Sequence, residues 1–488
     1  RSTPLYSSAA SDVYKRQCQY KYCITGPIYC QPWQPTINTT MSKKIKIVYD
    51  YFNGEYPIIN NLSSMDIAYE HYGHNPRKMW ALCNPMQTMR VLDNHLFEFI
   101  PSFMLKDDDI FLYEITLRAE MSGDRNIYGV ELLEYMLSNI DLPEKIKHDI
   151  KYNNGYLLIE YMTESYLGDM ELDMFHLHFN KYEIPLNKVI YYTGSINGTD
   201  VYRKYCNRKN IAERMNIVTF EWFEWLSSIQ LQELEGLLPK EKDFNRVEKS
   251  FLCYNNKYRH WRADLYTIFY KHDLLKHSYF SMFEKCDHWG GDWESFYHSE
   301  KHATSYRNDI KDELNITDKD IKHLNSMLPL VIDNTINEWD RIKLIAPEPN
   351  LFYQSLISVV TETNFVYMDV FFTEKTWKPI ANYHPFILIG PYKSLEYLKS
   401  LGYKTFNDFF DEGYDDEPEH GLRLLKIGKL CKEINEWPTQ KKKDFFYGVK
   451  DITAHNFNLL KSIYPNNRRL KFWDKFMLET GLVKGQIK

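Results

Sequence analysis

Charged side chains between residues 358 and 390 form a pattern that could hold a diphosphate. Thr373, Glu374 and Lys375 fall at the start of a predicted helix, and Lys378 follows about one turn later. A helix N-terminus presents N–H groups and a partial positive charge, so these residues predict a seat for a pyrophosphate. Glu374 could accept hydrogen bonds from ribose hydroxyls, as acidic residues do in other nucleotide-binding folds. The alternative is ordinary capping, in which Thr373 caps the helix and Lys375 is solvated.

A second basic pair lies upstream of this segment. Asn255 and Asn256 end a predicted strand, and Arg259 and Arg262 follow at the start of a predicted helix. A guanidinium can make two parallel hydrogen bonds to a phosphate, so either arginine could contact the same ligand. The alternative is that both arginines lie on a solvated helix face.

Together the two segments resemble the donor-binding motifs of fucosyltransferase-like glycosyltransferases. That family carries Phe-Glu-Asn-Ser, then Asp-Tyr-x-Thr-Glu-Lys, a helix and Val-Pro-Val-Val-x-Gly. An upstream strand ends in Ser-Asn before an Arg that opens a helix. The resemblance covers residues 249–412 and departs from the family at Tyr383-His384. The matching residues are Glu362, Asn364, Asp369, Thr373, Glu374, Lys375, Pro385 and Gly390, with Asn255, Asn256 and Arg262 upstream.

The resemblance implies an inverting glycosyltransferase that moves a sugar from a nucleoside-diphosphate sugar to the hydroxyl of a glycan or other acceptor. Fucose carried by GDP is the finer expectation. Arg262, Lys375 and the helix N-terminus would stabilise the leaving diphosphate, so no metal and no further cofactor is expected. The alternative is a non-catalytic carbohydrate- or nucleotide-binding protein derived from such a domain.

The same reaction needs a general base, which should come from the first domain. A carboxylate there must come within hydrogen-bond reach of the acceptor hydroxyl. No motif identifies it. By position the candidates are Glu164, after a predicted strand, Glu160 on that strand, and Glu55 after the first strand.

Two series of alternating strands and helices must position these residues. This alternation predicts an α/β fold, and the resemblance implies a GT-B-like pair of Rossmann-type domains facing across a cleft. We place an acceptor-side domain at 41–240 and a donor-binding domain at 249–435, joined by a polar linker over Leu237–Lys249, with a helical tail at 436–488 that packs back across the junction. The first series has strands over Lys44–Asp50, Asp109–Ile115, Tyr156–Met162 and Lys188–Thr193, and helices over Tyr128–Ile140 and Asp173–Tyr182.

The second series carries the donor motif. Its predicted strands are Ser250–Tyr254, Leu330–Ile332, Leu356–Val360 and Pro385–Gly390, and its predicted helices are Arg259–His272, Thr373–Asn382 and Ser394–Leu401, the last closed by Gly402. The stretch Ser394–Phe410 resembles a segment of phage and other viral glycosyltransferase-like proteins, which favours a viral or environmental bacterial source.

Composition excludes several other classes of protein. The 488 residues include 60 basic and 66 acidic ones, a net charge of −6, which excludes a strongly basic nucleic-acid binder. No apolar run approaches the roughly 20 residues of a membrane-spanning helix. The five cysteines after residue 40 are scattered and odd in number, which favours reduced thiols in the cytoplasm of a bacterial cell or a virus-infected host.

The first forty residues do not fit the rest of the chain. Arg1–Gln17 has neither helical nor strand periodicity and resembles the translated read-through of a sequencing adapter. Met41 opens a basic lead into an apolar run, as a protein start does. We therefore expect residues 1–40 to be spurious or disordered.

Overall fold

The computed structural model describes residues 45–49, 97–116, 137, 142–161, 167–234, 242–255, 259–282, 285–286, 291–292, 305–332 and 349–463. The expected N-terminal segment 1–40, Glu55, Glu164 and Asn256 lie outside these residues. The predicted helix Tyr128–Ile140 also lies outside them, apart from Leu137, which is helical.

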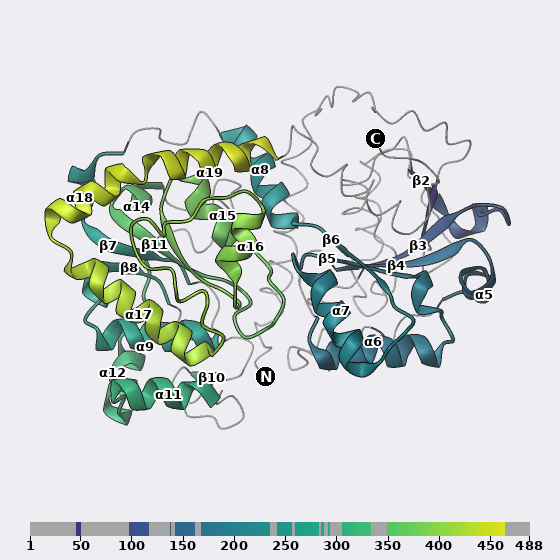
Figure 1. Ribbon diagram of the computed structural model, residues 1–488, viewed down its shortest axis with the longest axis horizontal. Helices are drawn as coiled ribbons and strands as arrows, with labels where there is room; N and C mark the ends of the chain where they lie inside the picture. The colour runs from purple at the N-terminus through teal and green to yellow at the C-terminus, as the bar shows by residue number, and fades with distance from the viewer. Residues whose placement is uncertain are drawn as a thin grey trace, which may run out of the picture.

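Two parallel β-sheets organise the described chain (Figure 1). The first sheet comes from the N-terminal half and has the order β2-β1-β3-β4-β5-β6. Its strands are β1 Ile45–Tyr49, β2 Phe97–Pro101, β3 Phe111–Thr116, β4 Gly155–Tyr161, β5 Val189–Thr193 and β6 Asn216–Thr219. The second sheet has the order β12-β11-β7-β8. Its strands are β7 Lys249–Cys253, β8 Ser278–Phe280, β11 Ser355–Thr361 and β12 Phe386–Ile389. A two-residue pair, β9 Lys285–Cys286 and β10 Gly291–Asp292, is antiparallel.

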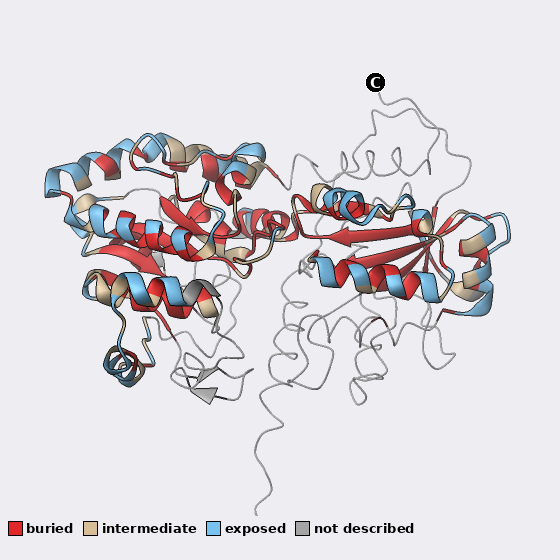
Figure 2. Cartoon of the chain, turned by 60° about the horizontal axis from the view of Figure 1, so that its bottom comes forward, coloured by how far each residue is buried: buried red, intermediate tan, exposed pale blue. Residues whose placement is uncertain are grey.

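Helices cover the sheets, and their outer faces are exposed while the strands are buried (Figure 2). Strands β5 and β11 are buried along their whole length, as expected for parallel strands covered on both faces. The helices associated with the first half are α5 Glu144–Tyr152, α6 Asp169–Lys181, α7 Gly198–Lys209 and α8 Trp222–Leu234. Those of the second are α9 His260–Lys271, α11 Ser305–Leu314, α12 Asp318–Ser326, α14 Pro349–Tyr353, α15 Glu374–Ala381, α16 Ser394–Ser400, α17 His420–Glu436, α18 Thr439–Gly448 and α19 Lys450–Ser462.

The predicted α/β fold is confirmed, with three corrections to its elements. Leu330–Ile332 is not a strand, because Leu330 makes only an isolated antiparallel bridge to Met282. Helix α6 begins at Asp169 rather than Asp173, since its first turn uses the acidic residues Asp169 and Glu171. The described part of the linker contains a short 3-10 helix, Phe244–Arg246. Gly402 follows α16 with a φ of 97°, as a C-terminal glycine does.

The last described helix lies near the junction between the two halves. Helix α19 lies against α8, and the backbone oxygen of Lys461 accepts a hydrogen bond from Gln232 Nε2 at 2.7 Å. The first sheet also meets the second half directly, since Ile196 N donates to Val370 O at 2.8 Å. Within the described residues, no helix is both long and apolar enough to span a membrane.

Candidate functional site

Glu362 follows β11 directly and organises the start of α15. Its side chain is completely buried, at 0% exposure. Its Oε1 accepts hydrogen bonds from Thr373 N at 3.1 Å and from N and Oγ1 of Thr376 at 3.1 and 2.6 Å. Its Oε2 accepts from Thr373 Oγ1 at 2.6 Å and Thr363 N at 3.1 Å. In this arrangement Glu362 fixes the start of α15 to the end of β11, and its expected contact with a donor stays a prediction.

The first turn of α15 has few N–H groups left for a phosphate. The N–H of Thr376 bonds to Glu362, and the N–H of Lys375 donates to Oγ1 of Thr373, the N-cap residue, at 3.4 Å. Glu362 already supplies the negative charge that the helix N-terminus favours, so a pyrophosphate at this position would depend on the charged side chains of α15. Thr373 caps the helix, as the capping alternative expects, but Lys375 is half-buried and hydrogen-bonded rather than solvated.

Three charged side chains of α15 nevertheless remain half-buried, namely Glu374, Lys375 and Lys378. Lys375 Nζ lies 2.9 Å from Oε1 of Glu374 and also donates to Oγ1 of Thr363 at 3.2 Å and of Thr373 at 3.1 Å. Burial alone would raise the pKa of Glu374, but Lys375 and Lys378 outweigh it and lower that pKa to about 2. Burial lowers the pKa of Lys378, and Glu374 opposes that shift. The cluster thus holds charges of both signs at the end of the second sheet.

Helix α9 brings the upstream motif to the same strand end. Arg262 Nη2 donates to Thr361 O at 3.1 Å, and Thr361 Oγ1 donates to Asn255 Oδ1 at 2.6 Å. Arg262 is only 2% exposed and Asn255 only 1%. Burial first, and Arg259 second, lower the pKa of Arg262 to about 10. Both side chains therefore bond to Thr361 at the end of β11, and their expected contacts with a donor stay predictions.

The remaining donor candidates differ in exposure. Arg259 is the N-cap residue of α9 and is half-buried, so its side chain is more accessible than that of Arg262. Asn364 is 6% exposed, and its Nδ2 has no hydrogen-bond partner among the described residues. Among the upstream residues that the structure describes, Arg259 is therefore the one best exposed for a ligand.

Of the three general-base candidates, Glu160 alone is described. It lies on β4 between Thr116 and Tyr192 of the neighbouring strands and is 1% exposed. A carboxylate this buried is poorly accessible to an acceptor hydroxyl, and the role of Glu160 as a general base stays a prediction.

Sequence reasoning missed the residues that join the two halves. Asn197 follows β5, and its Oδ1 and Nδ2 bond to Val370 N at 2.7 Å and Met368 O at 3.1 Å. Asp369 lies between these two residues, and Glu171 of α6 acts on it electrostatically. The available signal was a polar Ser-Ile-Asn-Gly loop at the carboxyl end of a buried strand, where ligand-binding and contact residues gather in parallel sheets.

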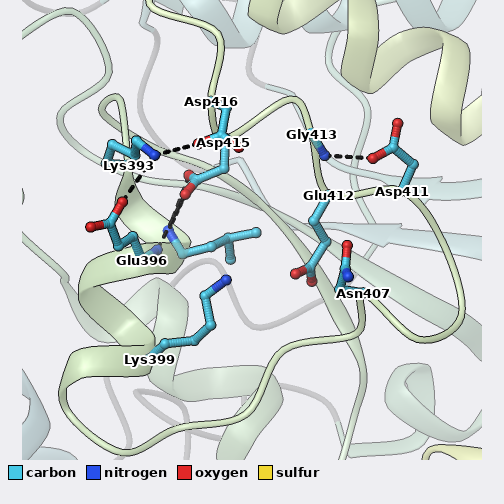
Figure 3. Close-up of a pocket in the computed structure, with 10 residues that line it drawn as sticks. Lys393, Glu396, Lys399, Asn407, Asp411, Glu412, Gly413, Asp415 and Asp416 are labelled. Carbon is cyan, nitrogen blue, oxygen red and sulfur yellow. Dashed lines mark hydrogen bonds and ion pairs between the residues drawn. The ribbon is translucent and has the colours of Figure 1, made fainter.

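A separate pocket of about 510 Å³ lies beside α16 (Figure 3). Lys393 and Lys399 reach it from the α16 side, and Glu412 comes from the facing loop. Asp415 accepts hydrogen bonds from Leu395 N and Glu396 N and so caps α16. The predicted donor residues do not line this pocket.

Comparisons with known proteins find similarity only among solved structures, and at low sequence identity. A comparison with family profiles finds no match, and one with curated proteins finds none either. Among solved structures, an alpha,alpha-trehalose-phosphate synthase (UDP-forming) from Burkholderia vietnamiensis is similar, with 12% identity, 87% of each chain covered and a TM-score of 0.37. An alpha,alpha-trehalose 6-phosphate synthase from Burkholderia multivorans has 10% identity, 78% of this chain and 73% of its own chain covered, and a TM-score of 0.37.

Proposed function

We propose that the chain is a GT-B-type glycosyltransferase that moves a sugar, with inversion, from a nucleoside-diphosphate sugar to an acceptor hydroxyl. The observation that carries the proposal is the convergence of charged residues from two distant segments at one edge of the second sheet. Arg262 bonds the carbonyl of Thr361, and Lys375 bonds the hydroxyl of Thr363, so α9 and α15 meet at the end of β11. Ligands of parallel α/β sheets bind at this edge.

The half-buried members of the cluster take the donor in this proposal. Lys378 and Arg259 contact the diphosphate and stabilise the charge that develops as it leaves. Glu374 is held ionised by its lysine neighbours and accepts hydrogen bonds from ribose hydroxyls. Buried Glu362 and Arg262 hold these side chains in place. The stabilising charges all come from side chains, so the proposal requires no cofactor besides the donor substrate.

Two finer parts of the proposal concern the substrate and the base. The motif resemblance favours fucose on GDP as the donor. The base candidates are Glu164, Glu160 and Glu55 of the first half. We also place the protein in the cytoplasm, since Cys206, Cys253 and Cys431 are buried free thiols.

A non-catalytic nucleotide- or carbohydrate-binding protein is the second candidate. The burial of Glu160 favours it, because this carboxylate, the one described base candidate, is only 1% exposed and is poorly accessible to an acceptor hydroxyl. The two candidates share the donor site and differ in turnover.

A thermal-shift series with GDP-, UDP- and CMP-sugars tests the donor site. A donor at 100 times its Kd should stabilise the protein by about 2.7 kcal/mol. Lys378→Gln should weaken binding by roughly 10- to 100-fold, the loss of a charge-assisted hydrogen bond of about 1.5–3 kcal/mol. The same change at exposed Lys322 on α12 should leave the shift intact.

The outcomes separate the two candidates. No shift with any nucleotide sugar would reject the donor site, and an equal loss in Lys322→Gln would reject its specificity. A shift accompanied by nucleotide release that depends on an acceptor identifies a transferase. A shift without release under any acceptor identifies the binding protein.

A further inference from the structure

The contact between the two halves is built around Asn197. Its Oδ1 accepts from Val370 N at 2.7 Å, its Nδ2 donates to Met368 O at 3.1 Å, and Ile196 N donates to Val370 O at 2.8 Å. We call these three hydrogen bonds the Asn197 contact. They fix the backbone on both sides of Asp369, so this side chain is held at the junction.

Asp369 has an environment unsuited to a charge. The residue is 1% exposed, and neither carboxylate oxygen has a hydrogen-bond partner on another described residue. Removing a carboxylate from water without a partner is costly, and the group avoids that cost by binding a proton. A closed Asn197 contact therefore favours protonated Asp369.

The groups around Asp369 add to this preference. Helix α6 contributes Glu171, whose carboxylate folds back over the helix start, since a Cβ on Gly168 would lie 2.2 Å from its Oε2. The 193–197 loop of the first half carries no titratable side chain. Helix α8 places Phe223 against Phe371, with ring centroids 5.8 Å apart.

The other charged residues nearest along these elements already have partners. Glu224 of α8 accepts a hydrogen bond from Tyr403 at 2.7 Å. Glu374 and Lys375, which follow on the chain of Asp369, pair with each other at 2.9 Å. The electrostatic neighbour of Asp369 is thus another acid, Glu171.

We propose that the Asn197 contact is a proton-controlled latch between the two halves, which holds while Asp369 is protonated and opens as Asp369 ionises. Opening exposes the carboxylate to water and separates it from Glu171. The latch would operate whether or not the chain binds a nucleotide sugar.

The direction of the pH effect follows from the two states. Burial, and to a lesser degree Glu171, raise the pKa of Asp369 from its ordinary value of 3.8 to about 7 in the closed form, although a hydrogen bond from its own backbone N–H opposes the shift. In the open, hydrated form the pKa returns toward its ordinary value. Because the closed form binds the proton more tightly, closing is most favoured at low pH. The equilibrium constant for closing falls by up to about tenfold per pH unit as pH rises toward 7, and above pH 7 it levels off.

Amide hydrogen exchange measures the latch directly, because the N–H groups of Ile196 and Val370 are donors in it. Exchange should be followed by mass spectrometry on peptides covering these residues from pH 5 to 8, after correction for the intrinsic pH dependence of exchange. Peptides from β11 serve as the reference for global unfolding. We expect protection at Ile196 and Val370 to fall between pH 5 and 7 while that of β11 does not follow it.

Variants make the assignment specific. Asp369→Asn should remove the pH dependence and raise protection at pH 7.5, whereas Asn197→Ala should lose protection at every pH. Exposed Asp408→Asn is the matched control and should keep the wild-type profile. If the β11 peptides show that Asp369→Asn does not fold, Glu171→Gln should still reduce the pH dependence of protection at Ile196 and Val370. A flat wild-type profile, or an unchanged response in Asp369→Asn or in a folded Glu171→Gln, would overturn the proposal.

Discussion

The carboxylate of Glu362 fixes the start of α15 to the end of β11. Five hydrogen bonds from Thr363, Thr373 and Thr376 converge on its two oxygens. Asn197 performs a similar task at the junction. An asparagine at a helix start usually caps that helix, but Asn197 makes no side-chain cap with α7, because its polar atoms bond to the second half. In both cases a single buried polar side chain sets the relation between two elements.

Replacing Glu362 with Gln should destabilise the protein by about 3 kcal/mol. All the groups around Glu362 donate hydrogen bonds, whereas the side-chain nitrogen of Gln can itself only donate. At least one charge-assisted hydrogen bond of about 1.5–3 kcal/mol is therefore lost, and a buried polar group is left without a partner. Urea unfolding measures the change. The control is Glu419→Gln at the start of α17, an exposed N-cap without a side-chain cap bond, which should change stability by less than about 0.5 kcal/mol. Equal effects of the two variants would contradict this account of Glu362.

At the scale of elements, α17 packs on α9 through Gly428. A Cβ at this position would lie 2.4 Å from Cγ2 of Ile268, a side chain that is completely buried. A glycine inside a helix costs about 1 kcal/mol relative to alanine, so close approach of the two helices is the reason for it. This packing places α9, and with it Arg262, against the second sheet.

Gly428→Ala should therefore lower the free energy of unfolding by about 1–2 kcal/mol, since overpacking outweighs the gain in helix propensity. The clash depends on one neighbour, which gives a direct check. In an Ile268→Ala background the same substitution should be neutral or stabilising, and thermal unfolding of the four proteins of this cycle measures the difference. Additive effects would show that Ile268 is not the cause.

The sequence predicted the strands that are continuous apolar runs, including the edge strand β12, and missed short edge strands without such a run. Strands β4, β5, β7 and β11 were expected within two residues of their positions, because a strand buried on both faces is a continuous apolar run. The missed strands β2, β6 and β8 all lie at sheet edges, where short segments such as Ser278–Phe280 carry no such run. Leu330–Ile332 is also an apolar run, but among the described residues it forms only one isolated bridge and no ladder.

The sequence identified the two segments that form the candidate site, but not which of their side chains are buried. Motif spacing located both segments that meet at the end of β11. It could not tell that Glu362 and Arg262 turn inward while Lys378 and Arg259 stay half-buried, because this depends on how α15 and α9 pack on the sheet. Long-range pairs such as Asn197 with Val370, 173 positions apart, left no local pattern either.

At the scale of the whole molecule, α8 connects the two cores. Trp222, Trp225 and Ile229 pack in a core cluster with the first sheet, whereas Leu231 belongs to the core of the second. Helix α8 also lies against α15 and α19. We propose a domain boundary after residue 240, and helix α8, which precedes it, therefore packs in the cores of both halves.

This position of α8 predicts that two substitutions within one of its turns destabilise different sheets. Leu231→Ala and Ile229→Ala should each cost about 2–5 kcal/mol, as truncations in a packed core do. If the halves are separate domains, Leu231→Ala should lower hydrogen-exchange protection mainly in β11 and β12, and Ile229→Ala mainly in β5 and β6. Exposed Leu177→Ala on α6 is the control and should change neither sheet. Equal loss of protection in both sheets from either core variant would mean that the two halves unfold as one unit and that the boundary at 240 has no thermodynamic meaning.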